Sequence, residues 1–285
     1  MNRTTAAVRV AAVAALTGLA ACTSSGAPDG APDGPEAGHP ASAPAALPAL
    51  RTAERSTQQA GTARVRSTTV MGSQLSLTAD GLLAWRDGLS GSLTLRYTGG
   101  TAATTMRGLG VTSMQARYLH DAYYARMGDA FAAKTGGRHW LRYGYEDLKS
   151  LGGGADLAEQ MRSTTPDQSV RLLLDSGDVR AVGEETVDGR STTHYSGTVT
   201  VGDVTDAGLR QRLRSAGVTG ESLDIWIDEK NLLVKKVEKS STAGGKVTQS
   251  AHYSDYGVKV AVRRPPAADT QDFKALLSQS GTNPS

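Results

Sequence analysis

Apolar and polar residues alternate at every second position along several stretches of the chain. This alternation is typical of strands that bury one face and leave the other in water. The clearest runs are Leu75–Leu77, Leu93–Tyr97, Leu223–Ile227 and Val258–Val262. The turn sequences Asp87-Gly88 and Asp188-Gly189 lie between runs of this kind and predict antiparallel hairpins.

Extending this reading along the chain predicts a sheet with helices before it and in its middle. The expected strands are 62–70, 75–85, 92–97, 114–119, 122–127, 138–143, 179–187, 192–195, 223–228, 232–239, 246–253 and 258–262. The expected helices are 47–60, a segment around Leu151–Met161 broken by Gly152-Gly153-Gly154, one that starts at Thr165-Pro166 and closes at Gly177, and 206–216. This order predicts an α+β fold with one extended antiparallel sheet and helices gathered on one face.

The first residues have the layout of a secretory signal. Arg3 and Arg9 precede an alanine-rich apolar stretch that runs to about Leu19, too short to span a bilayer. The stretch ends in Leu19-Ala20-Ala21-Cys22, which resembles the lipobox of bacterial lipoproteins. The resemblance implies cleavage after Ala21 and acylation of Cys22, which then holds the chain on the extracytoplasmic face of the cell membrane.

Cys22 is the only cysteine of the chain. A secreted protein avoids a free thiol, so a single cysteine at the end of an apolar stretch favours lipidation over the alternative, an ordinary signal peptide with an incidental cysteine. We therefore expect a signal peptide over 1–21, a lipidated N-terminus and flexible Ala/Pro/Gly/Ser tether over 22–48, and one domain over 49–278.

Charge and composition argue against a nucleic-acid partner. Loss of Arg3 and Arg9 with the signal peptide lowers the formal net charge from +3 to +1. The remaining basic residues are scattered among acidic ones, with no basic run longer than pairs such as Lys235-Lys236. No second apolar segment of spanning length follows Cys22, so the membrane is expected to be reached only through the lipid anchor.

A search for catalytic and metal-binding patterns finds none, so we expect neither an enzyme nor a cofactor. The histidines are not spaced as zinc ligands, and no nucleophile elbow, P-loop or dinucleotide fingerprint occurs. The adjacent carboxylates Glu184-Glu185 and Asp228-Glu229 fall on strand edges or turns, where neighbours point to opposite faces.

Three stretches of the second half resemble a known family when taken together. They are Gly183–Gly189 followed by Thr193–Gly197, Ile225–Glu229 with Leu232–Val237, and Tyr253–Gly257 leading to Val262–Pro266. Their order is similar to that of actinobacterial lipoproteins of the LppX/LprG type, which share a fold with the lipoprotein carrier LolA and the sensor domain of RseB. The resemblance is clearest over 175–273.

The resemblance implies a half-open β-barrel, that is, a strongly curved sheet whose concave face is covered by helices and receives lipid acyl chains. The apolar strand residues expected to line such a cavity are Leu75, Leu77, Leu93, Leu95, Leu223, Ile225, Ile227 and Val237. Alternation alone fits a packed core equally well. The expected function is lipid or glycolipid binding, for transfer or presentation in the envelope. The alternative is a sensor module that contacts another envelope protein and carries no lipid.

Overall fold

The computed structural model describes residues 43–149, 165–176, 178–215, 217–242 and 245–279. Its strands are β1 (Thr62–Met71), β2 (Leu75–Ala84), β3 (Ser90–Gly99), β4 (Ser113–Tyr118), β5 (Ala122–Arg126), β6 (Trp140–Gly144), β7 (Arg180–Val187), β8 (Arg190–Thr200), β9 (Gly220–Asp228), β10 (Leu233–Thr242), β11 (Gly245–Ser254) and β12 (Thr270–Asp272). Its helices are α1 (Ala43–Ala60), α2 (Gly100–Gly108), α3 (Asp129–Ala132), α4 (Tyr145–Lys149), α6 (Pro166–Asp175), α7 (Ala207–Ser215), the short η1 (Ala267–Asp269) and α8 (Phe273–Gln279).

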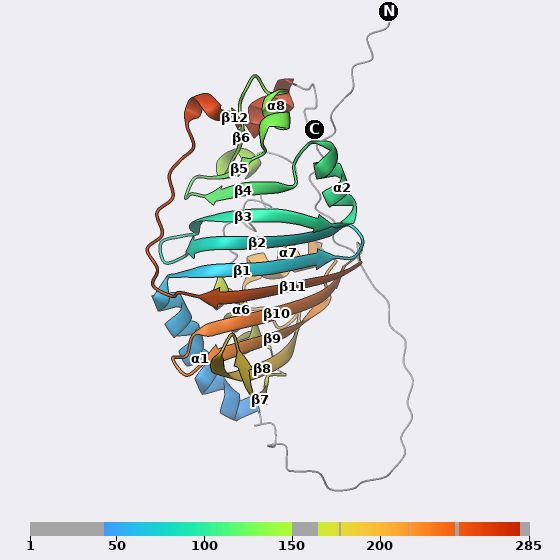
Figure 1. Ribbon diagram of the computed structural model, residues 1–285. Helices are drawn as coiled ribbons and strands as arrows, with labels where there is room; N and C mark the ends of the chain where they lie inside the picture. The colour runs from blue at the N-terminus through green and yellow to red at the C-terminus, as the bar shows by residue number, and fades with distance from the viewer. Residues whose placement is uncertain (1–42, 150–164, 177, 216, 243–244, 280–285) are drawn as a thin grey trace, which may run out of the picture.

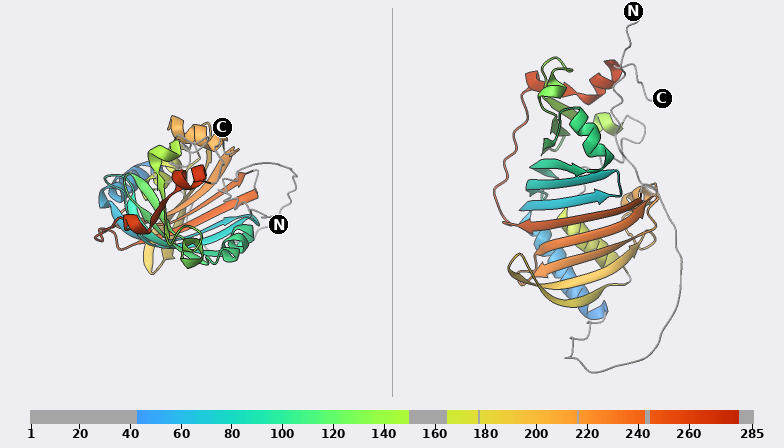
Figure 2. Two further views of the ribbon diagram at one scale, coloured as in Figure 1. Left: turned by 90° about the horizontal axis from the view of Figure 1, so that it is seen from above. Right: turned by 45° about the vertical axis from the view of Figure 1, so that its right-hand side comes forward.

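All twelve strands form one sheet in the order β12-β6-β5-β4-β3-β2-β1-β11-β10-β9-β8-β7. The sheet curves strongly and does not close into a barrel (Figures 1 and 2). Every pairing is antiparallel except that of β12 with β6, which is parallel. The predicted fold class, an α+β fold with a single curved sheet and helices on its concave face, is therefore confirmed, with one parallel edge strand added.

The hairpin between β7 and β8 illustrates why the sequence folds in this way. Asp188 and Gly189 both have positive φ, of 50° and 77°, as the tight turns that favour Asp-Gly require. The register then pairs Val187 with Arg190, and the strands continue as predicted on each side.

The prediction of a strand at 258–262 is wrong. Both edges of β11 are already occupied, by β1 on one side and β10 on the other, so no ladder is open to the chain after Asp255. The segment instead runs along the end of the sheet and leads to β12, which pairs with β6 at the far edge (Figure 1).

Helix α1 begins at Ala43, earlier than expected, so the last residues of the predicted tether are helical. Its buried stripe is Ala46, Leu50, Ala53 and Thr57. The spacing of three and four residues places these side chains on one face of the helix. The helix ends at Ala60, and the next residue, Gly61, has a φ of 69°, which suits the position just after a helix C-terminus.

Helix α6 starts as the sequence predicts, with extended Thr165 followed by Pro166 in the first turn. It lies beside α1 over β8, β9 and β10, and an ion pair of 2.7 Å between Arg171 and Glu54 joins the two helices. A Cβ at Gly197 on β8 would come within 2.7 Å of the Leu173 side chain. This glycine therefore lets α6 approach the sheet closely. The helix expected around Leu151–Met161 and the closing Gly177 lie outside the described residues.

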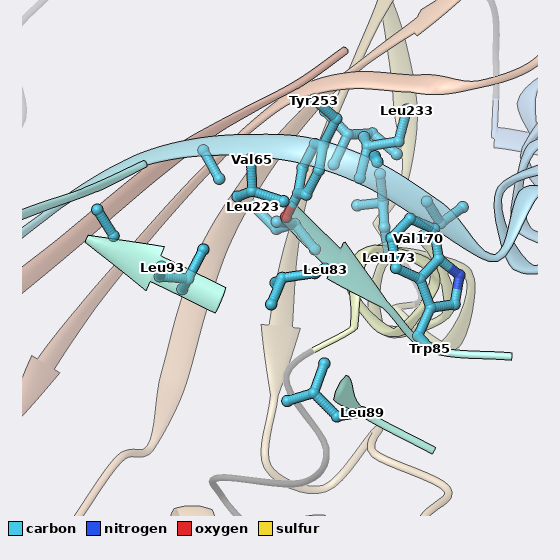
Figure 3. Close-up of a cluster of buried hydrophobic side chains, with 14 of the residues drawn as sticks. Val65, Leu83, Trp85, Leu89, Leu93, Val170, Leu173, Leu223, Leu233 and Tyr253 are labelled. Atoms are coloured by element: carbon cyan, nitrogen blue, oxygen red, sulfur yellow. The ribbon is translucent and has the colours of Figure 1, made fainter. Parts of the chain in front are cut away.

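One large hydrophobic core fills the space between α1, α6 and the sheet. Val65, Val170, Leu173, Leu223 and Leu233 are among its buried side chains (Figure 3). A row of aromatic rings continues this core over β4, β5 and β6. It runs from Tyr118 through Tyr123 and Tyr143 to Phe273 of α8, with ring centroids 4.7–5.8 Å apart.

Candidate functional site

The face of the sheet that carries the core is called the inner face, and the opposite face the outer face. The strand ends at which β1 turns into β2 and β10 turns into β11 are called the open end; they lie on the right in Figure 1. At the open end most inner-face side chains are only half-buried, Thr242 being a buried exception, whereas those beneath α1 and α6 are fully buried.

The predicted cavity residues separate into three groups. Five of them are buried inside the packed core: Leu93, Leu95, Leu223, Ile225 and Ile227. Leu75 and Leu77 face inward but are half-buried, at the open end. Val237 lies on the outer face, where it packs against Val187, Trp226 and Val234, and this position takes it out of the predicted lining.

Half-buried apolar side chains on β1, β2, β3 and β11 gather at the open end. This apolar band consists of Met71, Leu75, Leu77, Tyr97 and Val247. The register places Met71 opposite both Leu75 and Val247, and Leu77 opposite Tyr97. The band is therefore continuous across four strands of the inner face.

Ionisable side chains lie next to this band, on β9, β10 and α6. Lys236 faces inward from β10 opposite Ile225, and is only 4% exposed. Its Nζ donates hydrogen bonds of 2.8 Å to Glu238 Oε1 and to Ser169 Oγ on α6. Ser169 in turn donates to Glu238 Oε1 over 2.7 Å. These three residues form a closed hydrogen-bonded triangle between helix and sheet.

Two further carboxyl groups lie on β9 and α6. The triangle together with Glu221, whose charge acts on Lys236, is called the ionic cluster. Glu221 faces inward from β9, and burial raises its pKa to about 8, with Glu238 adding to the rise and Lys236 opposing it. Asp167 of α6 is buried and lies 4.0 Å from Arg171 through Oδ2. Its Oδ1 is buried without a hydrogen-bond partner among the described residues.

The contact between Ser169 and Lys236 has the geometry of a serine nucleophile with a lysine base. A lysine acts as a base only when it is neutral. Burial alone would lower the pKa of Lys236, but the charge of Glu238 and the nearby Tyr253 hold that pKa above its ordinary value. Lys236 therefore stays an ammonium ion that donates to Ser169 and does not act as its base.

Sequence reasoning missed the ionic cluster, although one signal was present. Consecutive residues of a strand point to opposite faces, so Lys235-Lys236 cannot both reach solvent from a strand with one buried face. The pair therefore indicates one inward lysine, which needs an inward acid. Glu238, two residues further along the same face, supplies it.

Two hollows on other parts of the described surface, of about 460 and 560 Å³, lie away from the inner-face space. Arg86 and His120 are among the residues that line the first, and Arg66 and Arg96 among those that line the second. Within the described ranges, no three His, Cys, Asp or Glu side chains group closely enough to hold a metal ion. Cys22 lies outside those ranges.

The helices give no sign of a membrane span. Among the described residues, none of them combines the length and the apolar character needed to cross a bilayer.

Comparison with known proteins identifies relatives at the levels of sequence and of fold. No family model matches the chain. The Streptomyces coelicolor protein "Putative lipoprotein SCO4650" is 59% identical over 231 residues, which cover 80% of this chain and 75% of that protein. The Streptomyces griseus "Uncharacterized 31.2 kDa protein in rplA-rplJ intergenic region" is 46% identical over 244 residues, covering 81% of this chain and 80% of its own.

Among solved structures, the lipoprotein LppX of Mycobacterium tuberculosis matches 78% of this chain and 100% of its own, with a TM-score of 0.50 and 19% identity. A match at 19% identity shows that the two proteins share a fold, and it shows nothing about a shared function. The strand order, the inner-face helices and this match agree with the expected resemblance. The chain therefore belongs to the family of the Streptomyces coelicolor lipoprotein and has the LppX-type fold.

Proposed function

We propose that the protein is an envelope lipoprotein, acylated at Cys22, that binds lipid acyl chains on the apolar band at the open end of the inner face. The band is the observation that carries the proposal. Helices α1 and α6 and the aromatic row cover most of the rest of the inner face, but Met71, Leu75, Leu77, Tyr97 and Val247 stay half-buried.

Covering apolar area stabilises a complex by about 25 cal/mol per Å². Half-buried side chains that face one another across four strands therefore favour an apolar ligand more than the scattered exposed residues of an ordinary surface do. The chain has few of the latter among its described residues, Val70 and Val182 being the exposed large hydrophobic ones. The band is therefore the part of the described inner face best suited to an acyl chain.

The anchor supports the same function. Two or three acyl chains on Cys22 would hold the protein at the extracytoplasmic face of the cell membrane, since each buried CH₂ contributes about 0.8 kcal/mol. A domain held there meets membrane lipids at high local concentration, and transfer or presentation of such lipids requires only a modest affinity.

The test is to purify the chain from Thr23 to Ser285, without signal peptide or anchor, and to measure bound lipid by native mass spectrometry. We expect lipid to copurify with the wild type. Leu77→Gln should reduce its amount several-fold, because it places an amide in the apolar band. Val70→Gln is the matched control, since Val70 lies one position from Leu77's partner Thr69 and points to the outer face, with 38% exposure.

An empty wild-type protein from several expression hosts would contradict acyl-chain binding. The alternative, a sensor that contacts an envelope protein and carries no lipid, would gain support if crosslinking in membranes then captured one specific protein in stoichiometric amount.

A further inference from the structure

The outer face of the sheet carries an excess of positive charge. Among the described residues, Asp80 is the only carboxylate that faces outward on the neighbouring strands β5, β4, β3, β2, β1, β11 and β10. The formal net charge expected after loss of the signal peptide is only +1. The sheet therefore gathers on one face basic residues that are scattered among acidic ones in the sequence. Those on the seven strands are Arg64, Arg66, Arg96, Arg117, Arg126, Lys235, Lys239 and Lys246.

Most of these basic side chains have no acidic partner. Arg64 forms ion pairs of 2.8 Å with Asp80 and 3.5 Å with Asp255. The others form no ion pair with any residue that the structure describes. In the free protein their charges are offset by salt ions of the solution. A polymeric anion that takes the place of those ions gains free energy from their release.

A hollow of about 560 Å³ lies at the centre of this face. Arg66 lines it from β1 and Arg96 from β3, on either side of β2. Asp80 also lines it, but its carboxylate is already bound by Arg64. Arginine presents several N–H donors in a planar fork that suits phosphate oxygens. The hollow therefore offers two such groups beside outward hydroxyls, which are those of Thr68, Thr78, Thr94 and Ser250.

The shape of the outer face limits the kind of anion that can reach all of its cations. The face is convex, because the sheet curves around α1 and α6, which lie behind it in Figure 1 (see also Figure 2). At about 4.8 Å per strand, the cations from β5 to β10 extend over an arc of roughly 30 Å. A flat bilayer can touch only part of a convex arc, whereas a flexible chain can follow it. The curvature therefore favours a linear, flexible polyanion.

The same face lacks the features that nucleic acids and proteins use. Trp140 and Trp226 point outward but are buried, with Arg117 and Lys235 lying 4.4 and 4.1 Å from their ring centroids. Neither ring is open to stack on a base. Val70 is the one exposed large hydrophobic side chain among the described residues of these strands, whereas protein interfaces depend on several apolar or aromatic anchors. A phosphate polymer without bases fits this surface better.

We propose that the outer face, centred on the hollow lined by Arg66 and Arg96, binds a flexible linear polymer of polyols joined by phosphodiesters. The guanidinium and ammonium groups bind the phosphates, and the hydroxyl side chains of the hollow bind the hydroxyls of the polyol. This surface lies on the opposite side of the sheet from the apolar band. It is therefore a second binding activity, which does not depend on acyl-chain binding.

The test uses the full-length chain, purified in a non-ionic detergent, and poly(glycerol phosphate) with a fluorophore at one end. Fluorescence anisotropy measures binding over a series of salt concentrations. We expect the logarithm of the binding constant to fall linearly with the logarithm of salt concentration, by about 0.7 per phosphate contact. Arg66→Gln/Arg96→Gln should lower the affinity about tenfold at roughly 150 mM salt and make the slope shallower by about 1.4, since two contacts are lost.

The matched control removes the same charge from the other side of the sheet. Arg51→Gln/Arg55→Gln changes two exposed positions of α1 and should keep the wild-type affinity and slope. A second outer-face pair, Lys239→Gln/Lys246→Gln, should weaken binding in the same direction as the arginine pair. A thermal melt checks that each variant folds, and the lysine pair decides the question if the arginine pair does not fold.

Four results would overturn the proposal. The first is no binding by the wild type even at about 50 mM salt. The second is an affinity that both outer-face pairs leave unchanged, or that the control lowers equally. The third is tighter binding of single-stranded DNA or polyglutamate of the same charge, which would assign the face to another polyanion. The fourth is displacement of the polymer by phosphatidylglycerol mixed into the micelles at equal phosphate concentration, which would assign the face to lipid head groups.

Discussion

Replacing Lys236 by methionine tests whether the ionic cluster stabilises the fold. At 2.8 Å and an effective dielectric constant of about 20, the gross attraction between Lys236 and Glu238 is on the order of 6 kcal/mol. Removing one partner of a buried pair typically costs about 3–5 kcal/mol, because the other charge is left buried. The Glu238 side chain is 15% exposed and faces the open end, so it can regain some water. We therefore expect a loss of about 3 kcal/mol.

Removing the whole triangle should cost far less than removing Lys236 alone. The triple variant Lys236→Met/Glu238→Leu/Ser169→Ala leaves neither a buried charge nor a hydroxyl without its partners. It should lie within about 1 kcal/mol of the wild type, as hydrophobic replacements of buried ion pairs do. The chain from Thr23 to Ser285 would be unfolded in urea and followed by the fluorescence of its three tryptophans, Trp85, Trp140 and Trp226, all of which are buried.

Two results would refute this reasoning. A loss below about 1 kcal/mol in Lys236→Met would show that the lysine is not desolvated as its burial indicates. A triple variant as unstable as the single one would show that the cluster is needed for the fold itself.

Three further predictions concern the core, the ionic cluster and the anchor. Leu223→Ala should lower the unfolding free energy in urea by about 2–5 kcal/mol, because Leu223 is fully buried beneath the helices, and a loss below 1 kcal/mol would contradict the packed core. Glu221 has a pKa raised to about 8 in the folded protein, above its ordinary value of 4.5, so the folded state keeps a proton that the unfolded state has released. Stability should therefore fall as the pH rises from about 4.5 to 8, Glu221→Gln should flatten that fall in urea titrations, and an unchanged slope would contradict the assigned environment. Cys22→Ser should move the protein from the detergent phase to the aqueous phase on Triton X-114 partition or leave the signal peptide uncleaved, whereas normal cleavage with retention in detergent would rule out acylation.

Much of the fold could be predicted from local sequence patterns, because the structure forms the helix starts and turns that those patterns favour. The start of α6 at Thr165-Pro166 and the Asp188-Gly189 hairpin depend on backbone preferences of the residues themselves, so they could be predicted. The prediction of a strand at 258–262 failed for a non-local reason. The alternation of apolar and polar residues cannot reveal that β1 and β10 already occupy both edges of β11. β12 is only three residues long and shows no period.

The position of Val237 shows how one irregularity changes a site prediction. In a regular strand Val237 would face inward with Leu233, four residues earlier. The register of β10 against β9 shifts between Leu233 and Lys235, as at a β-bulge. This shift turns Lys236 inward and Val237 outward, because a slip of one residue exchanges the two faces. The ionic cluster therefore depends on a feature that side-chain periodicity does not record.

The pairing of β1 with β11 at the centre of the sheet bears on how the protein is made. Arg64 pairs with Ser254, so the first strand lacks one of its two neighbours until the chain has been synthesised as far as β11. Contacts this distant in sequence slow folding and leave a strand edge open to wrong partners in the meantime. The proposed acylation of Cys22 can therefore precede completion of the sheet, and the domain would then assemble while already fixed to the bilayer.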